Sequence, residues 1–170
     1  MFVQPPSGRF DGSTHLFPVR VHYEDTDLSG ITYHANYLRW FERARSDMLR
    51  LLGVDQRLAA QDGTGTYAVA ELSIRYRAPA RLDDVVAIVT RARQVGAASV
   101  TLAQEAWLQQ SAIQVAEPMA DADRRGTMLA DATVRVGFVG PDGRPRRQPA
   151  AWRAAFQTVP GPVVAAEETR

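Results

Sequence analysis

Only one stretch of this chain has the apolar spacing of a long helix, and the segments after it alternate instead. Between Asn36 and Leu52, apolar residues recur at steps of three and four and so share one helix face: Tyr37, Phe41, Ala44, Met48 and Leu51. Gly53 follows directly and is a natural helix stop. At 1.5 Å per residue, the predicted helix is about 25 Å long, enough to lie across several strands of a sheet.

Strand patterns lie on both sides of this helix. A short one, 17–23, precedes it, and four follow at 67–77, 85–93, 99–108 and 127–139. In the first of the four we expect one face to carry Ala68, Ala70, Leu72, Ile74 and Tyr76, and the other Tyr67, Glu71, Ser73, Arg75 and Arg77. The connections between the late strands are too short for helical crossovers, so the pattern predicts an α+β fold with a five-stranded antiparallel sheet.

The chain length favours a single domain. The sequence has 170 residues and is 45% hydrophobic, enough for one core but not for two full domains. We expect the domain to span 15–158, with loose segments at 1–14 and 159–170 because neither has sustained periodicity. The stretch 109–126 is long for a hairpin loop and predicts a flap. One helix covers only one face of a sheet, so a homo-oligomer is expected to cover the other.

Composition excludes several classes of protein. Twenty basic and nineteen acidic side chains give a net charge of +1, so no overall field attracts nucleic acid or an anionic membrane. The absence of cysteine excludes thiol nucleophiles, disulfides and cysteine-based zinc sites. The chain has neither a secretory leader pattern nor an apolar run of about 20 residues. We therefore expect a cytoplasmic protein without a membrane span or a nucleic-acid partner.

Polar groups are densest between the first strand and the long helix. Three carboxylates (Glu24, Asp25, Asp27), the flexible Gly30 and His34 lie just before the predicted helix or at its start. A helix N-terminus has unpaired N–H groups that stabilise a developing oxyanion, and a nearby carboxylate can attack a carbonyl or activate water. Acidic residues before a helix also serve as ordinary caps, so the spacing alone leaves both interpretations open.

The order of these residues strongly resembles the signature of the 4-hydroxybenzoyl-CoA thioesterase family. It is most similar to the Tol-Pal-associated acyl-CoA thioesterase branch of that family. Residues 19–27 read VRVHYEDTD, 30–34 read GITYH, and 41–45 in the predicted helix read FERAR. The likeness continues through 75–84, RYRAPARLDD, and 141–149. It covers roughly 18–156, with gaps.

The resemblance implies a hotdog fold, in which the antiparallel sheet wraps around one long central helix. It also implies hydrolysis of acyl-coenzyme A to a free carboxylic acid and coenzyme A, by a homo-oligomer built as a dimer or a dimer of dimers (a homotetramer). No cofactor or metal is implied, since coenzyme A is part of the substrate. Asp27 matches the catalytic carboxylate, acting as nucleophile or general base, and the backbone N–H of His34 matches the donor that polarises the thioester carbonyl. Gly30, Tyr33 and Asn36 are the candidate substrate-binding residues, although structural roles such as capping the helix are favoured for Tyr33 and Asn36. The His34 side chain could bind water or substrate, or be structural.

Departures from the family pattern leave the acyl group open. Thr32 replaces a usual valine, residues 94–99 lack the expected Arg-Gly-Thr-Ser turn, and the loop 109–126 is longer than expected. Arginines are the candidates for binding the coenzyme A phosphates: Arg91, Arg93, Arg124, Arg125, Arg144, Arg146 and Arg147.

Parts of this pattern are also compatible with other functions. A hotdog acyl-thioester dehydratase would pair His34 with a carboxylate as acid and base, and a non-catalytic module would bind acyl-CoA with Asp27 as a mere cap. A metal hydrolase using His22, Asp25 and Asp27, or His34, lacks the helical ligand spacing of known motifs. No Gly-x-Ser-x-Gly elbow is present.

Overall fold

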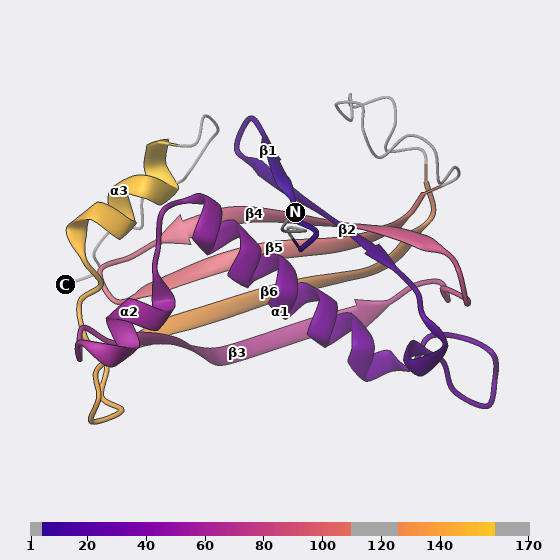
Figure 1. Cartoon of the computed structure of the whole chain (residues 1–170), viewed down its shortest axis with the longest axis horizontal. Helices are drawn as coiled ribbons and strands as arrows, with labels where there is room; N and C mark the ends of the chain where they lie inside the picture. Colours follow the sequence, from indigo (N-terminus) through magenta and orange to yellow (C-terminus); the bar gives the residue numbers. More distant parts are fainter. Residues whose placement is uncertain (1–4, 110–125, 159–170) are drawn as a thin grey trace, which may run out of the picture.

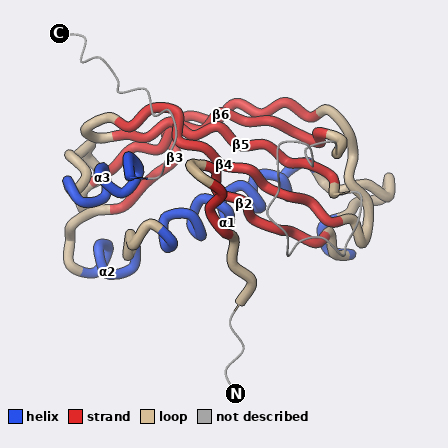
Figure 2. The backbone as a smooth tube through the Cα atoms, turned by 90° about the horizontal axis from the view of Figure 1, so that it is seen from above, coloured by secondary structure: helices blue, strands red, loops and turns tan. Residues whose placement is uncertain are grey.

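The computed structural model describes residues 5–109 and 126–158. They form one antiparallel sheet with a long helix along one face, as Figures 1 and 2 show from two directions. The strand order is β1-β2-β4-β5-β6-β3. The strands are β1 (Arg9–Asp11), β2 (Thr14–Arg20), β3 (Thr66–Tyr76), β4 (Val85–Val95), β5 (Ser99–Leu108) and β6 (Met128–Val139). The helices are η1 (Tyr23–Asp25), α1 (His34–Leu51), α2 (Gln56–Gln61) and α3 (Ala150–Thr158).

The expected α+β hotdog architecture is present, but the count of five strands is wrong. The sixth strand, β1, pairs antiparallel with the start of β2, with Asp11 opposite Thr14. Gly12 has a φ of 55°, which suits the tight two-residue turn of this hairpin. A strand of three residues is too short to show alternation, so the only local sign of the hairpin is the turn dipeptide Gly12-Ser13.

The N-terminal boundary also differs from the expectation of a loose segment over 1–14, because residues 9–14 form β1, a turn and the start of β2. The expected tail 159–170 lies outside the described residues, and so does most of the expected flap, at 110–125. Among the residues described, no helix combines the length and the hydropathy needed to cross a membrane.

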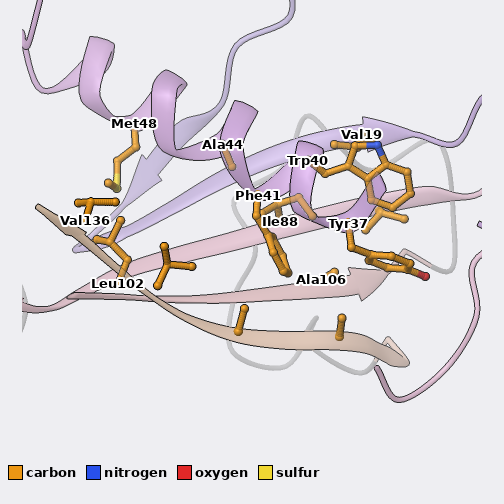
Figure 3. Packing of buried hydrophobic residues seen from close by; sticks show 14 of the residues in the cluster. Val19, Tyr37, Trp40, Phe41, Ala44, Met48, Ile88, Leu102, Ala106 and Val136 are labelled. Carbon is orange, nitrogen blue, oxygen red and sulfur yellow. The ribbon is translucent and has the colours of Figure 1, made fainter. Parts of the chain in front are cut away.

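The core lies between α1 and the sheet. The buried face of α1 includes the five residues Tyr37, Trp40, Phe41, Ala44 and Met48. Figure 3 shows these side chains against residues of four strands: Val19, Ile88, Leu102, Ala106 and Val136. Burying a large apolar side chain contributes roughly 1.5–3 kcal/mol, so this seam fixes α1 on the sheet. The N-terminal end of α1 is thereby held at one end of the strands.

The predicted faces of β3 are correct only beyond a β-bulge. The pairing with β6 shifts register between Val69 and Glu71. Before the shift, Tyr67 points into the core, with its ring 5.3 Å from that of Phe138, whereas Ala68 is exposed. After it, Leu72 and Ile74 pack against the core as expected. One extra residue exchanges the two faces of a strand, and an alternation pattern read from sequence does not reveal where that happens.

Candidate active site

Asp27 lies in a tight turn whose backbone is held on both sides. Its N–H donates to the carbonyl of Ile31 at 3.1 Å, and its carbonyl accepts from the N–H of Gly30 at 3.0 Å. A bridge between Thr26 and Thr32 closes the base of the loop. Gly30 has a φ of 73°, a left-handed conformation that glycine adopts without steric cost. The turn therefore presents the Asp27 side chain in a defined direction.

The carboxylate of Asp27 is exposed and bonded through one oxygen only. Its Oδ1 accepts a hydrogen bond from the backbone N–H of Ser29 at 2.8 Å and another from the Ser29 hydroxyl. No described residue donates to Oδ2. The Ser29 hydroxyl, then the Ser29 N–H, and to a smaller extent the charge of His34 lower the pKa of Asp27. The group is therefore ionised at neutral pH, as a base or nucleophile must be.

The two neighbouring carboxylates are placed differently. Asp25 is buried, and its Oδ2 accepts the N–H of His22 at 2.8 Å, which caps the short helix η1. The carbonyl of Asp25 accepts the N–H of Tyr33 at 2.8 Å. Glu24 is exposed on η1. Spacing alone did not separate these three acids, and the structure assigns a capping role to Asp25.

The first turn of α1 leaves a backbone donor free. Tyr33 is the N-cap residue and makes no side-chain cap bond, while its carbonyl accepts the N–H of Asn36 at 2.9 Å. The N–H of Thr32 donates to the carbonyl of Ala80 at 2.8 Å. The N–H of His34 has no acceptor within 5–109 and 126–158. An unpaired N–H at the positive end of a helix is suited to binding an oxyanion.

Aromatic rings surround this helix end. The ring of His34 lies 4.4 Å from that of Tyr33 and 6.2 Å from that of Tyr76, measured between centroids. The hydroxyl of Tyr76 donates to the carbonyl of His34 at 3.0 Å. Within the part of the chain that is described, the imidazole of His34 makes no hydrogen bond and is exposed. The end of β3 thus contacts the first turn of α1.

The remaining predicted site residues lie in the same region. Gly30 shapes the turn, Tyr33 is 47% exposed, and Asn36 is buried. The side-chain amide of Asn36 donates to the carbonyl of Asp25 at 2.9 Å, so this residue ties the loop to α1. That contact favours the cap-like alternative for Asn36, while substrate contacts of Gly30 and Tyr33 stay a prediction.

Sequence reasoning missed two residues of this site. Ser29 stands two positions after Asp27, a spacing typical of turns closed by an aspartate side chain, so a local signal existed. Tyr76 reaches His34 across 42 residues of sequence. Nothing local indicates such a contact, because it depends on how β3 passes the end of α1.

The possible metal ligands bear on the metal hydrolase alternative, and the arginines bear on the binding of the coenzyme A phosphates. The described residues hold no group of three histidine or carboxylate side chains placed to bind a metal. Arg91 lies 3.5 Å from Glu105, and Arg146 donates to the carbonyls of Gly63 and Thr64. Arg93 and Arg147 are exposed. Arg124 and Arg125 lie outside the described residues.

Comparisons with known proteins agree on the family. The model of the thioesterase superfamily matches residues 29–113. Acyl-CoA thioesterase YbgC of Haemophilus influenzae is 37% identical over 123 residues, 72% of this chain and 79% of that protein. Acyl-CoA thioester hydrolase YbgC of Escherichia coli O6:H1 is 34% identical over 148 residues, 85% of this chain and 98% of that protein.

A solved structure is also similar along most of its length. The probable thioesterase from Bartonella henselae is 32% identical, with a TM-score of 0.66, over 80% of this chain and 99% of that one. The order of strands around one long helix and the matches in sequence thus indicate the same family. This chain belongs to the thioesterase superfamily.

Proposed function

We propose that this protein hydrolyses acyl-coenzyme A thioesters to a free carboxylic acid and coenzyme A. The observation that carries the proposal is the placement of an ionised carboxylate, Asp27, in a turn that leads into the free N–H of His34 at the start of α1. The relatives described above are named for the same activity. No resident cofactor takes part, because coenzyme A enters as part of the substrate.

In this mechanism the N–H of His34 donates to the thioester carbonyl oxygen. As that oxygen gains negative charge, the helix N-terminus stabilises it. Asp27 then acts in one of two ways. Its Oδ2 attacks the carbonyl carbon, coenzyme A leaves as a thiolate, and water hydrolyses the resulting mixed anhydride. Alternatively, Asp27 takes a proton from water, the hydroxide attacks, and the departing thiolate is protonated.

The nearest enzymatic alternative, the dehydratase, requires His34 as a working acid or base. The imidazole of His34 makes no hydrogen bond with Asp27 or with any other described residue, which supports a role for the backbone of His34 rather than its side chain. Replacing His34 with alanine distinguishes the two mechanisms. Thioester hydrolysis that needs only the backbone N–H survives this change, whereas acid–base catalysis by the imidazole does not.

We further infer a homo-oligomer that pairs through β3. This strand of 11 residues lies at one edge of the sheet and, among the described residues, pairs only with β6. A long unpaired edge is a template for another strand, and Val69 on it is 50% exposed. The outer faces of β3 and β6 carry ion pairs instead, such as Arg75 with Asp131 at 3.0 Å. These charges make the edge a better interface than the open face, which the sequence pattern had led us to expect a second subunit to cover. The mass in solution distinguishes one such dimer from a dimer of dimers.

The location follows from the substrate. Because coenzyme A thioesters are made and consumed inside cells, we propose that the protein acts in the cytoplasm.

Release of free thiol tests the activity directly. The purified protein is offered acyl-CoA thioesters from acetyl to palmitoyl, together with aromatic ones and acyl-carrier-protein thioesters, and free thiol is followed with a colour reagent. We expect turnover on at least one series, which also identifies the acyl group and the carrier. No turnover on the whole panel would leave the non-catalytic binding module as the better description.

A further inference from the structure

Among the described residues, Ser29 is the one that hydrogen-bonds to the proposed catalytic carboxylate. Both its backbone N–H and its hydroxyl donate to the same oxygen, Oδ1 of Asp27. We propose that Ser29 is a positioning residue, which fixes the rotation of the Asp27 carboxylate and directs the other oxygen, Oδ2, toward the substrate. This inference rests on the proposed function, since it assigns a role within the same site.

The turn explains why such a positioning contact matters. The backbone of Asp27 is already held through its N–H and its carbonyl, by Ile31 and Gly30. The carboxylate is exposed, and packing therefore does not restrict its side-chain torsions. The two bonds from Ser29 supply that restriction. Catalytic groups that are misplaced by about 1 Å lose up to about a hundredfold in rate.

The two hydrogen bonds from Ser29 also favour the ionised form of the Asp27 carboxylate. Hydrogen bonds that donate to a carboxylate favour its charged form, and Ser29 is the main reason that the pKa of Asp27 is lowered. The charge of His34, at the start of α1, lowers the pKa of Asp27 to a smaller extent. A nucleophile or general base works only when ionised, so the hydroxyl of Ser29 extends the active range toward lower pH.

The test compares three variants on an acyl-CoA substrate that the thiol-release panel identifies. Ser29→Ala removes the hydroxyl and keeps the backbone N–H, and Ser29→Thr restores a hydroxyl. The matched control is Ser46→Ala, because the exposed Ser46 hydroxyl donates to the carboxylate of Glu42 at 3.1 Å on α1, outside the site. Thermal midpoints are measured in parallel, so that loss of folding is distinguished from loss of positioning.

We expect Ser29→Ala to lower kcat about tenfold, with KM changed less than about twofold. The acidic limb of its pH–rate profile should move to higher pH, and Ser29→Thr should reverse both effects. A role confined to stabilising the turn would lower the thermal midpoint and leave the acidic limb in place. That result, or unchanged kcat in Ser29→Ala, would overturn the positioning role of Ser29. It would not contradict thioester hydrolysis, which depends on Asp27 itself.

Discussion

At the scale of single residues, the turn 27–31 depends on a backbone conformation that few side chains accept. Gly30 has a φ of 73°, and a Cβ added there meets no atom within 4 Å. Gly30→Ala should therefore cost about 1 kcal/mol of stability through backbone strain alone. Gly137→Ala is the control, since its Cβ also meets nothing and its φ is not positive. Chemical denaturation checks both; equal midpoints would show that the turn is not strained.

The site residues differ in how far sequence could identify them. Periodicity placed a carboxylate-rich loop before a helix, but choosing Asp27 over Asp25 needed the family resemblance. The structure adds a physical reason, because the Asp25 carboxylate already caps η1. The contact of Tyr76 with His34 depends on the tertiary fold, so no local pattern indicates it.

At the scale of elements, a buried polar cluster joins the N-terminal segment to α1. His15 is fully buried, and its Nε2 lies 2.9 Å from Oδ2 of Asp47. Asp47 also accepts the N–H of Gly8 at 2.8 Å and the hydroxyl of Ser7 at 2.9 Å. A carboxylate only accepts, so the bonded Nε2 carries the proton. These contacts hold the segment before β1 against the helix.

The cluster makes stability depend on pH. Burial lowers the pKa of His15 below 6.5, although Asp47 partly offsets this effect. The unfolded chain therefore takes up a proton that the folded chain does not, and the free energy of unfolding falls as pH falls from 6.5 toward the folded pKa. We expect a lower thermal midpoint at about pH 5.5 than at about pH 7.5.

Variants assign this pH effect to the histidine concerned. His15→Asn should flatten the dependence on pH, whatever it does to the absolute midpoint, while the exposed His22→Asn should leave the slope intact. Asp47 does not contribute to the change in stability between these two pH values. Burial would raise its pKa, but the bonds from Gly8, His15 and Ser7 outweigh burial, and its pKa is lowered from 3.8. A slope unchanged in His15→Asn would contradict the assignment.

Sequence patterns predicted the long helix and the long strands well. The strands β5 and β6 repeat their period several times, so their apolar faces are well defined. The helix α1 does so as well, except that Leu51, expected on its apolar face, is 44% exposed. In β4 the first six residues are all buried, so this strand has no alternation. The strand β1 has three residues, and the bulge at Ala70 changes faces within one strand. The strand β1 pairs with the adjacent β2 but is too short to show a period, whereas the bulge depends on the pairing of β3 with β6, which is distant in sequence. Periodicity therefore misses both features.

At the scale of the whole molecule, the free edge of β3 predicts self-association. Light scattering should give at least twice the monomer mass of 18.7 kDa. Val69→Asp should shift the protein toward monomer, because it places a charge on the proposed interface. Leu51→Asp is the control, an exposed leucine that is 44% accessible at the end of α1. A monomeric wild-type protein would refute pairing through β3.

The central claim is that Asp27 does the chemistry, and Asp27→Asn tests it most directly. This change keeps the size of the side chain and removes its charge. The control is Glu24→Gln, which removes an exposed carboxylate from the same loop. On the acyl-CoA that the wild-type protein hydrolyses fastest, we expect kcat to fall about a thousandfold or more in Asp27→Asn, with the thermal midpoint retained and Glu24→Gln near wild type. An Asp27→Asn protein that keeps near-normal kcat would contradict the account.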